Sequence, residues 1–234
     1  MQEIARRYKY LDVLTTMFVV VLLVSNLVAQ KVCAFGPFFG RTFYLSGAML
    51  LFPVTYIFGD VFTEVYGFSA SRRAIWLGFF GTALLYTMGA AVVALPGAPE
   101  WKNQQAFTIV FGFLPRMLAA SLVAYLAGEF ANSYTLARMK LWTNGRKLWT
   151  RTIGSTIVGQ AVDTTLVITL TFAGKYPTRR LAAIICASYL GKVAYETIAT
   201  PLTYLVIGWL KRSEHADVFD RHEDFNPFHF GAKK

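Results

Sequence analysis

Residues 10–30 read Y-L-D-V-L-T-T-M-F-V-V-V-L-L-V-S-N-L-V-A-Q, and Asp12 is the one charged residue among them. A helix needs about 20 predominantly apolar residues to cross the hydrocarbon core of a bilayer. Further runs of this kind lie at about 43–66, 74–95, 105–130, 153–173 and 181–210. The sequence therefore predicts an all-α, polytopic integral membrane protein with six transmembrane helices.

The composition favours the same class. Apolar and aromatic residues make up 55% of the 234 residues, and charged residues make up 15%, against about 25% in an average soluble domain. The chain has no GxxxxGK[ST] motif, and its three histidines, His215, His222 and His229, lie in the last twenty residues. This excludes a P-loop ATPase and histidine-based metal or haem sites within the spans. We expect no cofactor, no metal site and no enzymatic activity.

The net charge of +10 follows the topology. Of the 23 Lys and Arg residues, 15 lie in the N-terminus, the second and fourth loops and the C-terminus, and six lie in the other three loops. The positive-inside rule then places both termini in the cytoplasm. The basic excess attracts lipid headgroups, and we expect no nucleic-acid partner.

The predicted domain organisation is a transmembrane domain over residues 1–212 and a cytoplasmic polar tail over residues 213–234. The tail has no core of its own and is expected to lie on the membrane or on the helical body. A homo-oligomer is compatible with the sequence, but nothing in the sequence requires one.

Each predicted span that runs from outside to inside carries a proline at mid-depth, namely Pro53, Pro115 and Pro201. Proline frees a backbone carbonyl and permits a bend, and broken helices often border substrate cavities. One interpretation is that the three prolines are hinges in a weak 3+3 pseudo-repeat. The alternative is that proline is simply common in membrane helices.

Besides Asp12 near the start of the first run, seven charged residues lie within the apolar runs. On insertion scales, a charge that faces lipid at mid-depth costs roughly 2.5–3.5 kcal/mol. Seven such charges facing lipid would be prohibitive, so these side chains must point inward. They are Asp60, Glu64, Glu129, Asp163, Glu196, Arg116 and Lys192.

Helical spacing groups some of these residues. Lys192 and Glu196 are four residues apart, so they share a helix face and an internal ion pair is plausible. Asp60 and Glu64 also share a face. The alternative is that such groups only hold helices together. The carboxylates outnumber the bases, so at least one is expected to bind a proton or a cation, and a shared proton would couple transport to the proton gradient.

Other side chains beside the polar faces could contribute to a site. Four aromatic residues, Tyr56, Phe62, Tyr66 and Tyr195, could stack on a planar ligand. The small residues Gly154, Ser155 and Gly159 favour close helix packing over ligand binding.

Several longer motifs carry a resemblance to a known family. They are S-N-L-V-A-Q-K from Ser25, F-P-V-T-Y-I-F-G-D-V-F-T-E-V-Y-G from Phe52, A-S-R-R-A-I-W-L-G-F from Ala70, G-E-F-A-N-S from Gly128, R-T-I-G-S-T-I-V-G-Q-A-V-D-T from Arg151, K-V-A-Y-E from Lys192 and P-L-T-Y from Pro201. With these motifs the chain resembles the queuosine precursor transporter family, also called the vitamin uptake transporter family, over nearly its whole length.

The resemblance implies a single-chain carrier of six helices without an ATPase of its own. It implies import of 7-cyano-7-deazaguanine, its 7-aminomethyl relative or both across the bacterial inner membrane, for salvage into tRNA queuosine. A guanine-like edge presents two adjacent N–H donors that one carboxylate can accept, and Asp60 and Asp163 are candidates for this role. The expected substrate-binding residues are Asn26, Asp60, Glu64, Arg116, Gln160, Asp163, Lys192 and Glu196.

Three alternatives remain open. The same scaffold could carry another small planar metabolite or vitamin, or the chain could be the membrane subunit of a larger importer. An intramembrane enzyme that uses the carboxylates is less favoured, since the GxGD motif of presenilin-type proteases is absent.

Overall fold

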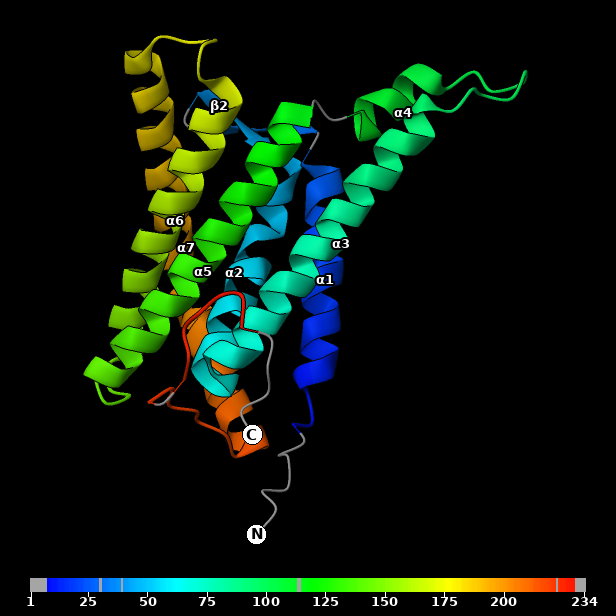
Figure 1. The fold of residues 1–234 in the computed structure, drawn as a ribbon. Helices are drawn as coiled ribbons and strands as arrows, with labels where there is room; N and C mark the ends of the chain where they lie inside the picture. The colour runs from blue at the N-terminus through cyan, green and yellow to red at the C-terminus, as the bar shows by residue number, and fades with distance from the viewer. Residues whose placement is uncertain (1–7, 30, 39, 113–114, 222, 230–234) are drawn as a thin grey trace.

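The computed structural model describes residues 8–29, 31–38, 40–112, 115–221 and 223–229. The terminal charges at Arg6, Arg7, Lys233 and Lys234, and His222, lie outside the described residues. Long helices lie roughly side by side and form a bundle (Figure 1). In chain order the helices are α1 (Leu11–Val28), η1 (Gly47–Leu50), α2 (Phe52–Val61), η2 (Phe62–Tyr66), α3 (Phe68–Ala94), α4 (Gln104–Phe111), α5 (Pro115–Trp142), α6 (Leu148–Phe172) and α7 (Thr178–Glu214).

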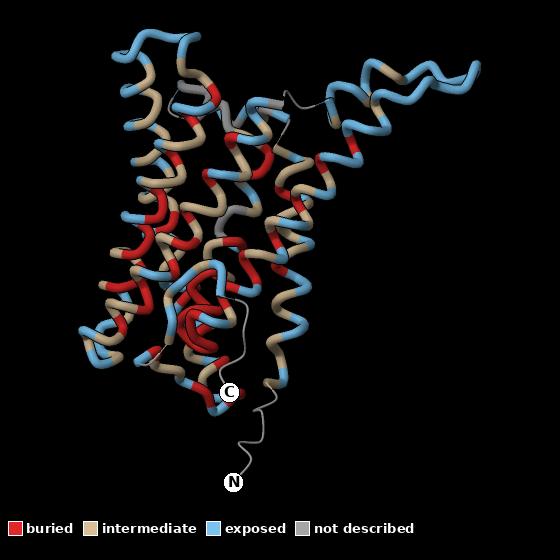
Figure 2. Tube along the Cα trace, in the orientation of Figure 1, coloured by how far each residue is buried: buried red, intermediate tan, exposed pale blue. Residues whose placement is uncertain are grey.

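The predicted membrane class is confirmed in its coarser form. Within the described ranges, α1, α3, the α4–α5 segment, α6 and α7 are long and apolar enough to cross a membrane. Large apolar side chains face outward from the bundle, including Phe80 on α3 and Ile198 and Leu205 on α7. Buried residues lie between the helices and at one end of the bundle (Figure 2). This distribution is typical of a helical protein surrounded by lipid.

The predicted second span, residues 43–66, is not one continuous helix. It consists of a strand, the 3₁₀ helix η1, the ten-residue helix α2 and the π-helical segment η2. The Ser46 hydroxyl accepts a hydrogen bond from Ala48 N and caps η1. Gly67, with a φ of +86°, separates η2 from α3. Capping and the positive φ explain why an uninterrupted apolar run breaks into short elements.

The prediction of an all-α chain is wrong at one place, because residues between α1 and η1 form a β-hairpin. Strand β1 (Val32–Phe38) pairs antiparallel with β2 (Arg41–Ser46), and Val32 lies opposite Ser46. Aromatic and β-branched residues suit a pleated surface, and Gly40 supplies a positive φ at the turn. The sequence prediction placed residues 31–42 in a loop and assigned the rest of β2 to the second span.

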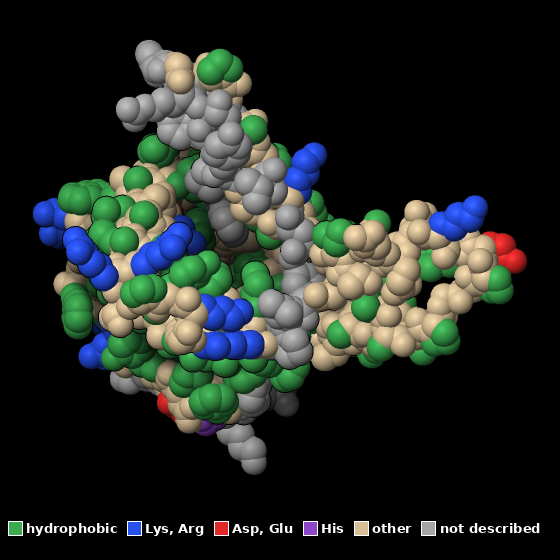
Figure 3. Space-filling model, turned by 90° about the horizontal axis from the view of Figure 1, so that it is seen from above, with side chains coloured by type: hydrophobic (Ala, Val, Ile, Leu, Met, Phe, Trp, Pro, Cys, Tyr) green, Lys and Arg blue, Asp and Glu red, His purple; other side chains and the backbone are tan. Residues whose placement is uncertain are grey.

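The hairpin defines one end of the bundle, called here the hairpin end. Figure 3 looks down on it and shows Lys and Arg side chains on this face, with the segment between α3 and α4 projecting to one side. The opposite end, where α1 begins and α7 ends, is called here the terminal end. Glu214 at the end of α7 accepts hydrogen bonds from the backbone N of Lys9 and Tyr10, so the start of α1 and the end of α7 lie at the same end.

The prolines occupy different helical positions. Pro53 lies in the first turn of α2 and Pro115 begins α5, where the missing N–H costs no helical hydrogen bond. Pro201 lies inside α7. The expected interior position is therefore found for Pro201 alone of the three. Helix starts are favourable for proline, which is the physical reason for the other two.

The polar tail, in its described residues 215–221 and 223–229, lies across the terminal end of the helical body (Figure 1). The Asp220 carboxylate accepts a hydrogen bond from the backbone N of Phe68, at 3.1 Å, and so caps α3 from a distant part of the chain. Trp76 on α3 donates its indole N–H to the carbonyl of Pro227 at 2.8 Å. The tail thus caps the start of α3 and contacts a second point along that helix.

Candidate functional site

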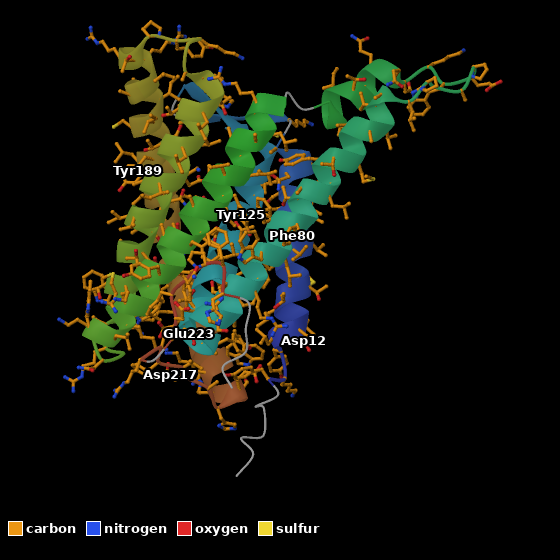
Figure 4. All side chains as sticks on the ribbon, in the orientation of Figure 1. Asp12, Phe80, Tyr125, Tyr189, Asp217 and Glu223 are labelled. Carbon is orange, nitrogen blue, oxygen red and sulfur yellow. The ribbon has the colours of Figure 1, made fainter. Side chains whose placement is uncertain are left out.

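A cavity of about 130 Å³ lies among five helices of the bundle. Tyr125, which is part of its wall, lies about midway along the bundle (Figure 4). The cavity is close in size to an engineered cavity of ~150 Å³ that holds one benzene, so it suits a small, flat compound. Its lining residues are Phe18 and Leu22 of α1, Thr55, Tyr56 and Gly59 of α2, Tyr125, Gly128, Glu129 and Asn132 of α5, Gly159, Gln160 and Asp163 of α6, and Lys192 and Glu196 of α7.

Two glycines bring α5 and α6 close together at the cavity. A Cβ atom added to Gly128 would lie 2.7 Å from Cβ of Asp163, and one added to Gly159 would lie 2.7 Å from Cβ of Asn132. Any side chain at either position would force the two helices apart. The Gly159 contact agrees with the predicted role of the small-residue strip in helix packing. It also sets the positions of Asn132 and Asp163 in the cavity wall.

Lys192 forms its ion pair across the helix interface. Its Nζ lies 2.6 Å from Oδ2 of Asp163, and each side chain is 26% exposed. The expected pair between Lys192 and Glu196 on the same helix is not formed. Lys192 on α7 has a carboxylate one turn away on its own helix and another on α6. Because α6 packs closely, the carboxylate of Asp163 is the nearer of the two.

Glu196 is oriented by a hydroxyl from α6. Thr156 donates a hydrogen bond of 2.6 Å to Oε1 of Glu196. The second oxygen, Oε2, is buried and has no hydrogen-bond partner among the described residues. Glu196 therefore presents a held carboxylate with one unused acceptor atom at the cavity wall.

Asp60 lies next to the lining without being part of it. The Asn132 amide donates a hydrogen bond to the Asp60 carboxylate, and Glu196 and Glu129 are its charged neighbours. Oδ1 of Asp60 has no partner among the described residues. Four carboxyl groups, those of Asp60, Glu129, Asp163 and Glu196, lie at or beside the cavity together with one ammonium group, that of Lys192.

Glu64 belongs to a separate ion network toward the terminal end. Arg151 donates to both of its carboxylate oxygens, at 2.8 and 2.6 Å, and Lys211 lies 2.6 Å from Oε1. Lys140 lies 3.7 Å from the same oxygen and 2.5 Å from Asp217 of the tail. The alternative interpretation, in which such charged groups only hold helices together, therefore describes the contacts of Glu64.

Two bases of this network, Lys140 and Arg151, lie in the segment that the sequence predicted as the fourth loop, but the structure places them in α5 and α6. Lys140 and Arg151 are each 1% exposed. Because a fully buried charge needs a partner, they hold Glu64 in place as well as contributing to the basic balance of this end.

Two more expected residues lie away from the cavity lining. Arg116, near the start of α5, donates to the carbonyls of Leu170 and Ala173 at 2.6 and 2.7 Å, and so caps the end of α6. Asn26 accepts a hydrogen bond of 3.0 Å from the Tyr86 hydroxyl. Both residues join helices to one another.

Of the four candidate stacking residues, one lines the cavity and the other three do not. Tyr56 lines the cavity and shares a hydrogen bond with Gln160. Phe62 packs in the apolar core, and the Tyr66 hydroxyl donates to Glu214 at 2.9 Å. Tyr195 is not part of the cavity lining. Tyr56 is therefore the best placed of the four to stack on a ligand in the cavity.

Sequence reasoning did not propose several lining residues as binding groups. Glu129 was recognised as an inward-pointing charge, and the signal that could have added Asn132 is their shared motif, G-E-F-A-N-S. Thr156 is not part of the lining but holds the lining residue Glu196, and it lies four residues before Gln160 on the same face of α6. Thr55 gave no sequence signal beyond its place one residue before Tyr56.

Comparison with known proteins identifies the class. A family model described as "Putative vitamin uptake transporter" matches residues 46–206. A protein of Bacillus subtilis (strain 168) named "Probable queuosine precursor transporter" is 32% identical over 167 residues, which are 71% of this chain and 72% of that protein. No solved structure matches this chain.

The membrane-competent helices and these relatives together define a multi-pass membrane transporter, not an enzyme. The chain belongs to the vitamin uptake transporter family, also called the queuosine precursor transporter family, as its motifs predicted.

Proposed function

We propose that this chain is a secondary transporter that imports queuosine precursors across the bacterial inner membrane. The substrates are 7-cyano-7-deazaguanine, its 7-aminomethyl relative or both. The polar cavity among five helices carries the proposal, in a chain with a relative named as a probable queuosine precursor transporter. A guanine-like edge offers adjacent N–H donors, and the cavity is rich in acceptors. The aromatic ring of Tyr56 would supply a stacking surface.

The proposed topology has six passes with both termini in the cytoplasm. Five passes are the long helices, and the short η1–α2–η2 segment, which is second in chain order, completes the six. Its helical part from Phe52 to Tyr66 spans about 22 Å, less than the ~30 Å hydrocarbon core. Since much of this segment is buried in protein, it need not match the lipid thickness. The excess of Lys and Arg at the terminal end supports a cytoplasmic location for that end.

The proposed mechanism exposes the cavity alternately to the two sides. Pro201 lies inside α7, which runs from the hairpin end to the terminal end, so we assign it as a hinge. We also propose coupling to the proton gradient. Carboxylates outnumber bases around the cavity, and a proton would offset part of this charge during transport.

Uptake in living cells tests the function. The chain is expressed in a bacterium that lacks precursor synthesis and its own precursor transporter, 7-cyano-7-deazaguanine is supplied outside, and queuosine in tRNA is measured. We expect queuosine with this chain alone and none with an empty vector. No queuosine despite normal membrane expression would contradict the proposal and favour another planar metabolite or a subunit of a larger importer.

Proton coupling has its own test. Uptake of labelled precursor by the same cells should fall when an uncoupler collapses the proton gradient, and should rise when the outside is made more acidic. Uptake that responds to neither treatment would remove proton coupling and leave the transport function in place.

A further inference from the structure

The cavity wall carries hydrogen-bond acceptors that lack donors. Oε1 of Gln160, Oε2 of Glu196 and Oδ1 of Asn132 are buried, and none has a partner among the described residues. Glu196 and Gln160 are 8% and 9% exposed, and both line the cavity. A buried acceptor without a partner is costly, so such atoms in a cavity indicate a ligand that brings donors.

Several donors at or beside this wall already have protein partners. Lys192 donates to Asp163, Thr156 donates to Glu196, and the Tyr125 hydroxyl donates to the carbonyl of Ile75. Thus the wall offers acceptors to a ligand and has committed these donors elsewhere. An anionic ligand would meet an excess of carboxylates with one ammonium that is already paired.

Among the carboxylates, the geometry distinguishes Glu196. Asp163 is paired with Lys192, and Asp60 is not part of the cavity lining and accepts a hydrogen bond from Asn132. Glu196 lines the cavity, is held through one oxygen by Thr156 and has its other oxygen unused. A preorganised carboxylate of this kind can accept two adjacent N–H groups, one on each oxygen, since Oε1 retains a second lone pair.

This inference rests on the proposed function and deepens it. We propose that Glu196, positioned by Thr156, is the specificity-determining residue that accepts the paired N–H donors of a guanine-like ligand, with Gln160 accepting a further donor. The cavity selects neutral or cationic planar ligands with adjacent N–H groups. It rejects anionic ligands and analogues that lack the exocyclic amine.

Competition against labelled 7-cyano-7-deazaguanine uptake tests the proposal. Guanine offers the ring N–H and the exocyclic amine, whereas hypoxanthine offers the ring N–H without that amine. A hydrogen bond to a charged acceptor contributes enough that guanine should compete about ten- to a hundredfold better than hypoxanthine in the unmodified protein. Equal inhibition by the two compounds would overturn the inference.

Substitutions then assign the discrimination to one carboxylate. Glu196→Gln should reduce the guanine preference to within about threefold, and Glu100→Gln on an exposed loop, which should keep it, serves as the matched control. A Glu196→Gln protein that still prefers guanine as strongly as the unmodified protein would overturn the assignment.

A second pair of variants decides the matter if Glu196→Gln cannot be measured. Thr156→Val removes the hydroxyl that orients Glu196 and should lower the guanine preference, and Thr156→Ser should restore it. An unchanged preference in Thr156→Val would overturn the positioning role. Failure of the proposed function looks different, because the unmodified protein would then take up no labelled precursor at all.

Discussion

Lys192 on α7 and Asp163 on α6 form an ion pair of 2.6 Å in the wall of the cavity. Both side chains remain about one quarter exposed, so the pair is in contact with the cavity as well as with the protein. Glu196 lies one turn from Lys192 on the same helix and is held by Thr156 instead. The pair therefore joins two helices at the cavity while leaving Glu196 for other contacts.

We expect this ion pair to act as a unit in transport. Asp163→Asn leaves the Lys192 ammonium unpaired beside Glu196, and Lys192→Met leaves one more uncompensated carboxylate, so each should lower the uptake rate. The double variant should lose less than the product of the two single losses, by roughly 2- to 100-fold. Uptake rates at matched membrane expression measure the coupling. Independent, multiplying effects would show that the pair is not functionally linked.

The buried network around Glu64 should control stability. Glu64→Gln removes the carboxylate and leaves Arg151, Lys140 and Lys211 without their shared partner, so the free energy of unfolding should fall by about 3–5 kcal/mol. Denaturant unfolding in detergent measures the change, and the exposed Glu100→Gln should stay within about 0.5 kcal/mol. A Glu64→Gln protein as stable as the control would show that the network contributes no net stability.

Close packing at Gly159 should be required for the cavity. In Gly159→Ala the new Cβ would lie 2.7 Å from Cβ of Asn132, so α5 and α6 must separate and uptake should fall at least about tenfold. Gly191→Ala on α7 is the matched control, because no atom lies within 4 Å of its added Cβ. Uptake in both variants checks this. Equal uptake by the two alanine variants would contradict the role of the α5–α6 contact.

Attachment of the tail should depend on pH through Asp217. Partial burial alone would raise the pKa of Asp217, but hydrogen bonds from Lys140 and Lys211, together with their charges, lower it below its ordinary value. A lowered pKa means that the ionised Asp217 stabilises the folded state above about pH 4, the ordinary value for Asp. This contribution is lost as the pH falls through the lower folded-state pKa.

Unfolding midpoints from about pH 3 to about pH 7 test this dependence. Asp217→Asn should be less stable than the unmodified protein above about pH 5, by within ~1 kcal/mol because Asp217 is nearly half exposed. The difference should shrink below about pH 4. A difference that stays constant over the whole range would exclude titration of Asp217 as its source.

Much of the fold could be predicted from the pattern of apolar residues. Runs of about 20 residues with few charges identify membrane helices without any knowledge of neighbours. The prediction was wrong between α1 and α3, where a hairpin takes the place of the predicted loop and the start of the second span, and the short segments η1, α2 and η2 replace the rest of that span. Composition along the chain does not separate an apolar strand from an apolar helix end, since both are rich in the same residues.

The candidate site was predicted in part. Gln160, Asp163, Lys192, Glu196 and Tyr56 were expected near a ligand, and the structure brings them to one cavity. Glu64 and Arg116 were expected there for the same reason, the cost of a charge in lipid, yet they contact other partners. That cost requires a charged side chain to face inward, and it does not say which inward group the side chain meets.

The sequence by itself determined that this protein crosses the membrane several times and that its charged residues point away from lipid, because both conclusions follow from the free energy of single residues in hydrocarbon. The tertiary structure alone decided that Lys192 pairs with Asp163, that Arg151 holds Glu64 and that Glu196 keeps one oxygen unused. Those pairings depend on distances between helices, which are set where glycine allows α5 and α6 to touch.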